Sequence, residues 1–315
     1  MNYSKIAFTL SMAALPLLAL AEADISKTAQ KTEKAPEYVE TDLGEVPAHS
    51  SAELKYVKSD KAFTDAEALA LAKKSQNPIA NMRSFKFQNN TNTGIGPDDS
   101  TQNMLNVMPI LPFKISDDIL VISRTIIPIA SQPDFLTPEG DGRVNGVADT
   151  NMQFFFSPID LGESGIVWGV GPSFLLPTAT DDSLGQEKWG AGISGILLAQ
   201  PGRWVYGGVV SNVWSFAGAG EQDVNMLTLQ YFVNYNFDGG WYMLTSPIMT
   251  ADWEADTDHR WTVPLGGGFG KLFKIGSQPL TAQVSAYKNV VTPDDYGADW
   301  QVRAMVMWMF PRGKK

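Results

Sequence analysis

The sequence predicts an all-β protein, a transmembrane antiparallel β-barrel of about 12 strands with a short N-terminal helix. Three observations lead to this prediction. From residue 83 onward, apolar and polar residues alternate with the period of two that separates the faces of a strand. Tryptophans lie near the ends of these alternating stretches. Short turns alternate along the chain with longer, acidic connections, which is the asymmetry of outer-membrane barrels.

The alternating stretches define the predicted strands individually. Their number is even, as a single-chain bacterial barrel requires when both chain ends lie on one side of the membrane. The predicted strands are residues 83–91, 102–113, 119–130, 147–157, 165–177, 189–199, 203–216, 224–237, 241–253, 260–273, 279–291 and 299–310. The second and third of these are apolar on both faces, so the pattern does not predict their orientation.

Five prolines lie inside predicted strands, where each removes one hydrogen bond of the ladder. An unsatisfied carbonyl in hydrocarbon costs several kcal/mol. We therefore expect bulges or earlier strand ends at these positions. The residues are Pro109, Pro128, Pro172, Pro247 and Pro264.

Tryptophans that share a strand also share parity, as Trp204 and Trp214 do, and therefore lie on one face. That face carries indoles at both rims and aliphatic residues between them, which predicts the two aromatic girdles of a membrane barrel. A soluble sandwich would point its aromatic residues into the middle of its core. The predicted girdle residues are Trp168, Trp189, Trp204, Trp214, Trp241, Trp253, Trp261, Trp300 and Trp308.

The connections differ between the two predicted ends of the barrel. Tight turns at residues 116–118, 200–202, 238–240 and 275–277 contain the Gly, Pro, Asp and Ser that favour turns. The other connections are mostly longer and acidic, although stretch 158–164 on the short-turn side is also rather long. Because short turns are periplasmic in outer-membrane barrels, the acidic loops are predicted to be extracellular.

Residues 1–21 are predicted to be a signal peptide. Lys5 supplies the positive charge, residues 6–20 form the apolar region, and residues 19–21 provide the small-x-small cleavage site. The alternative, an N-terminal membrane anchor, is disfavoured because the apolar run is short and Pro16 interrupts it.

Residues 22–82 are predicted to form a polar N-terminal periplasmic segment, and residues 83–312 the outer-membrane barrel. A capping box of Thr64 and Glu67 predicts a short helix over residues 66–75, which Asn77-Pro78 ends. This helix is either a small periplasmic helix, which is the simpler interpretation, or a plug in or under the mouth of the barrel.

Composition excludes several classes of function. The net charge of −10, from 34 acidic and 24 basic residues, argues against nucleic-acid binding, which needs a basic face. The absence of cysteine excludes disulfides and thiolate metal sites. There are two histidines and no Gly-x-Ser-x-Gly motif, so His259 beside Asp258 is the sole candidate base for a hydrolase. No catalytic residue, metal ligand or cofactor is predicted, and the protein is not expected to be an enzyme.

Inward-facing side chains are candidates for lining a transport route. The charged ones are alternatively structural pairs, because an isolated charge on a barrel wall usually has an opposite partner. The methionines offer an adaptable apolar surface, which either packs against a plug or contacts a hydrophobic solute. The candidate lumen-lining residues are Arg124, Asp149, Gln153, Gln230, Asn234, Gln283, Tyr287, Arg303, Met305 and Met307.

Acidic residues concentrate in the predicted extracellular loops. The simpler interpretation is a solvated surface that aids solubility. The alternatives are divalent cations bridging to lipopolysaccharide phosphates, or a mouth that attracts cations. The residues are Asp181, Asp182, Glu187, Glu254, Asp256 and Asp258.

Several motifs occur in the same order as in a known family. They are residues 71–74 (LAKK), 76–80 (QNPIA), 87–90 (FQNN), 168–172 (WGVGP), 176–181 (LPTATD), 187–192 (EKWGAG), 214–218 (WSFAG) and 261–264 (WTVP). Over residues 70–312 the chain resembles the outer-membrane transporter family associated with the meta-pathway of phenol degradation, often mislabelled neuromedin U. The resemblance implies an outer-membrane barrel and uptake of aromatic or other small hydrophobic molecules, with no established site residues.

The hypothesis is a porin-like outer-membrane channel or transporter of a Gram-negative cell for small, hydrophobic or aromatic molecules. Its expected partners are outer-membrane lipid, lipopolysaccharide and a small-molecule solute, and both mature termini are expected in the periplasm. The alternative is a structural or surface-interaction barrel with a filled lumen. Barrel size does not decide between them, because this barrel lies between filled eight-stranded and open sixteen-stranded ones.

Overall fold

The computed structural model describes residues 63–96, 98–134, 142–294 and 297–310. The predicted signal peptide and residues 22–62 lie outside the described residues. Within the described residues, no helix is both long and apolar enough to cross a membrane.

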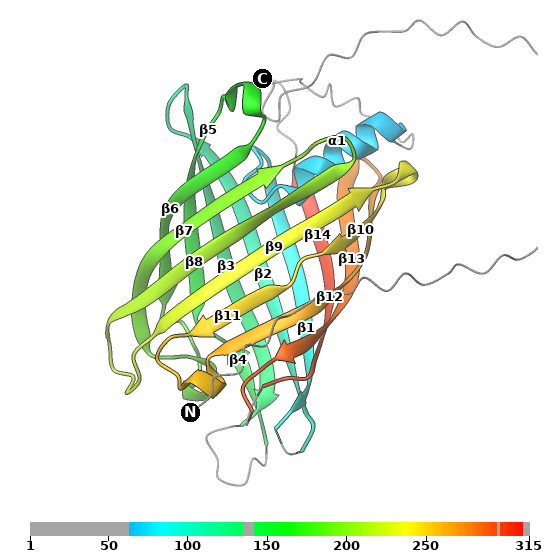
Figure 1. Ribbon diagram of the computed structural model, residues 1–315. Helices are drawn as coiled ribbons and strands as arrows, with labels where there is room; N and C mark the ends of the chain where they lie inside the picture. Colours follow the sequence, from blue (N-terminus) through cyan, green and yellow to red (C-terminus); the bar gives the residue numbers. More distant parts are fainter. Residues whose placement is uncertain (1–62, 97, 135–141, 295–296, 311–315) are drawn as a thin grey trace, which may run out of the picture. The chain divides into compact units, whose positions relative to one another are not determined.

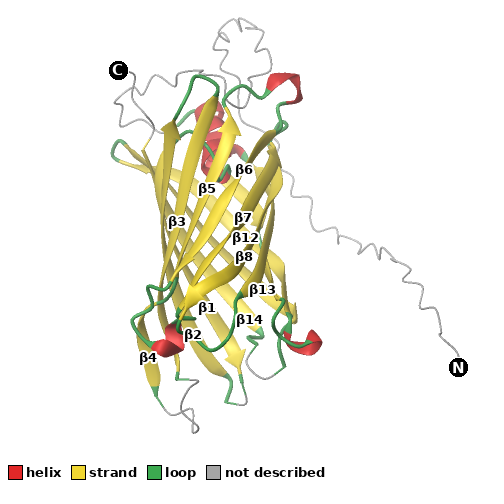
Figure 2. Ribbon diagram, turned by 90° about the vertical axis from the view of Figure 1, so that its left-hand side faces the viewer, coloured by secondary structure: helices red, strands yellow, loops and turns green. Residues whose placement is uncertain are grey.

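The described chain consists of one helix, four 3₁₀ turns and a series of antiparallel strands (Figures 1 and 2). The helices are α1 (Asp65–Gln76), η1 (Gly162–Ser164), η2 (Asp182–Leu184), η3 (Asp238–Gly240) and η4 (Thr257–His259). The strands are β1 (Arg83–Ile95), β2 (Ser100–Lys114), β3 (Ile119–Pro133), β4 (Arg143–Val147), β5 (Thr150–Pro158), β6 (Val167–Leu176), β7 (Lys188–Ala199), β8 (Trp204–Gly218), β9 (Asn225–Asn236), β10 (Trp241–Thr245), β11 (Ile248–Asp252), β12 (Trp261–Ile275), β13 (Gln278–Val291) and β14 (Trp300–Phe310).

These segments form a closed barrel of 12 strands, which confirms the predicted fold class. Consecutive strands pair with each other, except β4 with β5 and β10 with β11, and β1 pairs with β14 to close the wall. Two strands of the wall are each split in two: β4 and β5 both pair with β3, while β10 and β11 both lie between β9 and β12. Closure leaves no unpaired edge, as a sheet in hydrocarbon requires.

The five prolines named above all coincide with irregular pairing, whereas Pro112 of β2 pairs regularly with Ile122. Pro247 separates β10 from β11, and the register shifts beside Pro264. The junction of β4 and β5 lies opposite Pro128. At Pro109 and Pro172 the ladder is interrupted on one side without a shift. The expected bulges and breaks are therefore present, because proline cannot donate to the neighbouring strand.

The polar ends of β1 and β2 extend beyond the predicted strands. Thr91 donates to Asn103 at 2.8 Å, and Asn92 donates to Gln102 at 2.8 Å across the pair. These side chains are polar on both faces, so they carry no alternation from which a strand could be read. The alternation of apolar and polar residues stops where the outer face of the strand ceases to be apolar, whereas β1 itself continues to Ile95.

The tryptophans lie on the outer wall at two levels. Eight of them expose between 36% and 50% of their surface although they are large and apolar, while Trp261 is half-buried edge-on against Trp253 at 5.6 Å between ring centroids. Trp168, Trp204, Trp241 and Trp308 lie at the end of the barrel that carries the short turns; Trp189, Trp214, Trp253, Trp261 and Trp300 lie at the other end.

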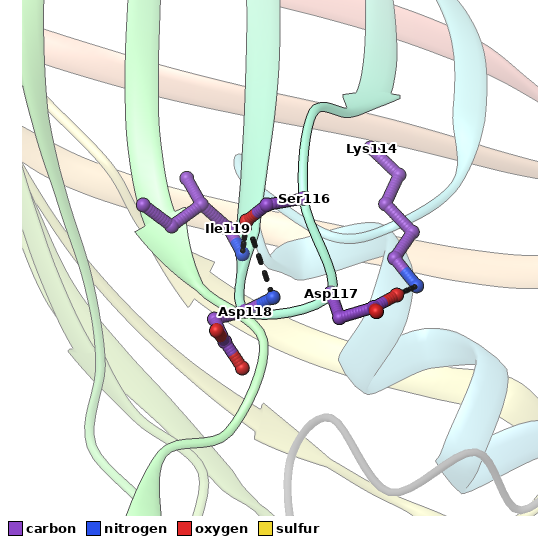
Figure 3. A network of polar contacts seen from close by, with 5 residues as sticks. All are labelled: Lys114, Ser116, Asp117, Asp118 and Ile119. Atoms are coloured by element: carbon purple, nitrogen blue, oxygen red, sulfur yellow. Dashed lines mark hydrogen bonds and ion pairs between the residues drawn. The ribbon is translucent and has the colours of Figure 1, made fainter.

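The short turns cluster at one end of the barrel, here called the turn end, where β1 begins and β14 ends. Figure 3 shows the turn between β2 and β3. The hydroxyl oxygen of Ser116 accepts hydrogen bonds from the amides of Asp118 and Ile119 at 3.3 and 3.0 Å. Lys114 donates to Asp117 at 2.7 Å, which lowers the pKa of that carboxyl. The side chains thus satisfy turn amides that have no partner in the ladder.

The structure orients β2 and β3, which the sequence pattern left unassigned. Ile110, Leu120 and Ile122 are buried inside the barrel, whereas Phe113 and Ile129 are exposed on the outer wall. Both faces are apolar because both are covered by apolar groups: the outer one faces the membrane, and the inner one packs against a chain segment inside the lumen.

Helix α1 begins with the predicted capping box. The backbone amide of Glu67 donates to the hydroxyl of Thr64 at 3.3 Å, and the amide of Thr64 donates to the Glu67 carboxylate at 2.9 Å. The hydrogen bond from the Thr64 backbone is the main cause that lowers the pKa of Glu67 below its ordinary value.

Replacing Thr64 with alanine should weaken α1 by about 0.5–2 kcal/mol, because the Glu67 amide loses the hydroxyl that accepts its hydrogen bond. Hydrogen exchange of the α1 amides measures this as lost protection, with Ala70→Ser on the exposed side of the helix as the control. A carboxyl whose pKa is lower in the folded than in the unfolded state stabilises the fold at a pH above its unfolded-state pKa. This contribution is lost as the pH falls through the folded-state pKa. Protection in the native protein should therefore also decrease under acid; unchanged protection in Thr64→Ala would contradict the capping role.

Candidate functional site: a partly filled barrel lumen

Helix α1 lies across the turn end of the barrel and is attached to its turns (Figure 1). The ammonium of Lys73 donates to the carbonyl of Gly202 at 3.0 Å, and Gln200 donates back to the carbonyl of Lys73 at 2.8 Å. At the other end of the helix, the Gly239 amide donates to the Asp65 carboxylate at 3.0 Å. The helix is therefore held at the barrel mouth, as the plug interpretation requires.

Residues 77–82, here called the lumen segment, connect α1 to β1 and enter the barrel. The Asn77 side chain accepts from the Ile79 amide at 3.0 Å and turns the chain inward. Ile79 has no exposed surface. It packs among apolar side chains from many strands: Ile110, Leu120, Ile122, Phe155, Val167, Ile196, Leu198, Val205, Val209 and Phe232. The wall therefore surrounds the lumen segment as a small hydrophobic core.

The inward methionines of β14 pack against this N-terminal chain. Met305, Met307 and Met309 expose between 0% and 6% of their surface and form one cluster with α1 and the lumen segment. Their partners are Ala68, Leu71, Ala72, Ala80, Met82 and Leu272. Of the two interpretations of the methionines, packing against a plug is the one that the structure shows.

A small polar cavity of about 80 Å³ lies beside the lumen segment inside the barrel. Four cationic residues line it, and no Asp or Glu does. One is Lys74 of α1; the three on the wall, Lys86, Arg124 and Arg303, are here called the basic cluster. Of the predicted lumen residues, Gln230, Asn234, Gln283, Met305 and Met307 also line this cavity. Sequence reasoning missed Lys86, although it has the inward parity of its neighbours Ser84 and Gln88.

The remaining predicted lumen residues are placed individually. Gln153 accepts from Arg124 at 3.3 Å, and Tyr287 is fully buried below the Arg303 guanidinium, 4.9 Å from its ring centroid. Asp149 lies outside the strands. Its carboxylate accepts from the amides of Ala179 and Gln186 at 3.1 and 2.7 Å and so fixes the loop between β6 and β7. Asp149 and Arg303 are therefore not paired with each other.

Arg303 also stabilises the break in the wall at Ser246-Pro247. Its guanidinium donates to the Ser246 carbonyl at 2.7 Å, while the Ser246 amide donates to the Tyr287 hydroxyl at 3.1 Å and Gln230 donates to the Ser246 hydroxyl at 2.8 Å. The ladder between β10–β11 and β12 is interrupted here, from Gly268 to Thr262. Side chains thus replace the missing strand partners, as backbone at membrane depth requires.

The opposite end of the barrel, the loop end, contains a wider cavity of about 710 Å³. Asp223, Asp252, Glu254 and Asp256 line it, and it is here called the acidic vestibule. Asp223 accepts from Lys188 at 3.3 Å, the first cause of its lowered pKa, and from Ser215. Asp252 was not among the predicted loop acids because it lies inside a strand, but its parity matches that of buried Tyr242 and Leu244.

The other predicted loop acids do not line the vestibule. Asp181 accepts from the Ser183 amide at 3.0 Å and caps η2, in which Asp182 lies. Glu187 precedes β7 with a φ of 51°, and Asp258 lies in η4 beside His259. Within the described residues, no group of three or more His, Asp or Glu is arranged to hold a metal ion.

The geometry defines a class of protein: a closed antiparallel barrel with an apolar, tryptophan-bearing exterior and a lumen into which its own N-terminal chain is packed. That exterior is the one found in transmembrane barrels. Comparisons with known proteins agree at the level of the fold. No protein-family model matches the chain, and no curated protein is significantly similar to it.

Solved structures supply the comparison. The COG4313 outer membrane channel from Pseudomonas putida F1 is 15% identical and covers 73% of this chain and 94% of its own, with a TM-score of 0.56. The Salmonella typhi outer membrane phospholipase (12% identity, 79% of this chain, 98% of that one) and the Pseudomonas putida toluene transporter TodX (8%, 76% and 93%) each reach a TM-score of 0.39. The first of these establishes a shared barrel fold.

Proposed function

We propose that the protein is an outer-membrane channel or transporter for small, hydrophobic or aromatic molecules. The observation that carries this proposal is the way in which the lumen is closed. A separate chain segment, the lumen segment, fills the turn end, while the loop end contains a cavity of about 710 Å³. A plug that is not part of the wall can move without unfolding the barrel.

The orientation in the membrane follows from the same proposal. Residues 1–21 direct export, the turn end and both mature termini face the periplasm, and residues 22–82 form the periplasmic segment that ends in the plug. The loops then contact lipopolysaccharide, and the outer wall contacts lipid. The similarity of fold to a channel supports the proposal, as does the resemblance to the transporter family associated with phenol degradation.

Uptake in cells tests the proposed function. A lipopolysaccharide-rich outer leaflet slows apolar solutes, so cells that lack the protein should accumulate radiolabelled toluene more slowly than cells that contain it. Restoring the wild-type gene should restore the rate, whereas uptake of labelled glycerol should stay the same. Equal toluene uptake with and without the protein would contradict the proposal.

A second candidate function is a structural or surface-interaction barrel with a permanently filled lumen. The complete burial of Ile79 within an apolar cluster favours it. Planar-bilayer recordings of a protein lacking residues 22–80 separate the candidates. A channel should conduct once the plug is removed, whereas a barrel filled by its own wall should stay closed. The deletion extends past the helix because the lumen segment, and not α1, fills the lumen.

Neutralising the acidic vestibule should change ion selectivity. Carboxylates around a cavity raise the local concentration of cations, so the triple variant Asp252→Asn, Glu254→Gln, Asp256→Asn should shift the reversal potential towards anion selectivity. Measurements in a salt gradient on the protein lacking residues 22–80 provide the readout. The shift should be larger at low salt, because screening at about 0.15 M already limits the field to about 8 Å.

The matched control is the triple variant Asp181→Asn, Asp182→Asn, Glu187→Gln, which removes three charges from outside the vestibule lining. Its reversal potential should shift less. Equal shifts in the two triple variants would mean that the total charge of the loops, and not the vestibule, determines selectivity.

A further inference from the structure

Charge is distributed unevenly between the wall and the loops. Among the residues of the described strands, Asp252 is the sole acid, and it is the last residue of β11. Three cations of the wall nevertheless face the small cavity in the lumen, which Lys74 of α1 also lines: Lys86 from β1, Arg124 from β3 and Arg303 from β14. The described salt bridges, Lys114–Asp117, Lys188–Asp223 and Arg203–Asp238, all lie outside this cavity. The basic cluster thus has no counter-charge in the lumen.

The three cations differ in how far the protein satisfies them. Each of the three guanidinium nitrogens of Arg303 makes a hydrogen bond: they donate to Asn90, Ser246 and Gln301 at 3.0, 2.7 and 2.7 Å. Arg124 makes one long hydrogen bond, of 3.3 Å, to Gln153. Within the described part of the chain, the Lys86 ammonium has neither a hydrogen bond nor an ion pair, and it lies within electrostatic range of both guanidiniums. Arg303 therefore has a structural role, whereas Arg124 and Lys86 retain N–H donors that have no acceptor among the described residues.

An arrangement of this kind is costly without a ligand. Burying like charges together, away from water, destabilises a fold unless an opposite charge or hydrogen bonds compensate. Structural charges on a barrel wall normally pair with each other, and here they do not. An anion would meet both needs at once, because it brings the opposite charge and acceptors for the lysine and arginine donors.

We propose that Lys86 and Arg124 bind the carboxylate of a small organic anion inside the lumen, with Arg303 adding to the positive field. This inference rests on the proposed function and adds that the molecules which bind in the lumen are small organic carboxylates. Ile110, Phe232 and Leu244 line the same cavity and would contact the apolar body of the ligand. Since one water occupies about 30 Å³, the cavity of about 80 Å³ accommodates a carboxylate-sized group beside the lumen segment.

The acidic vestibule does not oppose equilibrium binding at this site. Its carboxylates are partly exposed to solvent, where salt screens their field within about 8 Å. Arg124 and Arg303 expose 9% and 1% of their surface and Lys86 is half-buried, so the field of the basic cluster is screened less. The vestibule therefore slows the arrival of an anion without removing its binding site.

The test measures binding of benzoate to the full mature protein in detergent by isothermal titration calorimetry and by the shift in thermal unfolding. Benzyl alcohol serves as the neutral probe of the same size. We expect benzoate to bind at least tenfold more tightly than benzyl alcohol. The double variant Lys86→Met, Arg124→Met should lose at least tenfold in benzoate affinity and should keep its affinity for benzyl alcohol.

Two controls keep the test decisive. Lys288→Met removes a charge from the exposed outer wall and should leave benzoate affinity unchanged. Lys86→Arg preserves the charge and should retain most of the affinity. If the cluster had a purely structural role, the double variant would change the unfolding temperature but not the size of the benzoate-dependent shift. That result, or equal affinities for the two probes, would overturn the inference.

The outcomes for this site and for the proposed function are separable. Toluene uptake that depends on the protein, without preferential benzoate binding, would support transport and reject the anion site. Benzoate binding that depends on Lys86 and Arg124, without any transport, would support the site and reject the channel.

Discussion

Replacing Ala304 with arginine should reduce the free energy of unfolding in a bilayer by about 2–4 kcal/mol, because it places a charge on the lipid face. Ala304 lies midway along β14 on the outer wall, with Phe87, Phe269 and Val284 around it. A guanidinium at this depth has no partner and cannot easily reach the interface. Urea titration of the protein folded into lipid vesicles measures the loss.

The matched control is Thr228→Arg in β9, whose side chain faces the acidic vestibule. A guanidinium there meets water and carboxylates, so the loss should be clearly smaller. The adjacent inward residue Met305 is a poorer control because it packs against the N-terminal chain with 6% of its surface exposed. Equal losses for Ala304→Arg and Thr228→Arg would mean that the faces of the wall are assigned incorrectly.

Replacing Ile79 with aspartate should expel the lumen segment and open the lumen of the barrel. Ile79 is completely buried among apolar side chains, so a carboxylate there would lack both water and a partner. The barrel does not need to unfold to avoid this cost, because the lumen segment can leave the lumen. Single-channel recordings should therefore show a large increase in conductance, while heat-modifiable migration of the barrel on gels stays unchanged.

Two variants separate loss of the plug from other effects. Ile79→Val removes one methylene, which typically costs about 0.5–1.5 kcal/mol, and should leave the channel closed. Asn81→Asp adds the same charge two residues away at an exposed position and should also leave it closed. Conductance that does not change in Ile79→Asp would mean that the wall itself, and not the lumen segment, closes the barrel.

Most of the wall of the barrel, although not the faces of β2 and β3, could be predicted from the sequence because its determinants are local. Membrane and lumen impose opposite polarities on alternate residues, so β14 shows outward Trp300, Val302 and Ala304 between inward Arg303 and Met305. The turns needed Gly for left-handed backbone, as at Gly202 and Gly276 with φ of 51° and 60°. The capping box of α1 was also visible, since its hydrogen bonds join residues three apart.

The lumen could not be predicted in the same way, because its contacts join strands that are far apart in the sequence. The apolar inner faces of β2 and β3 are explained by Ile79, and Arg303 proved to hold Ser246, 57 residues away. The alternation of residues along each strand shows that Lys86 and Arg124 face inward. It does not show that both line the same cavity, or that no Asp or Glu lines it. The sequence by itself therefore determined a membrane-spanning wall, while the tertiary structure decided what fills that wall, because packing and charge pairing in a closed barrel are set across its diameter.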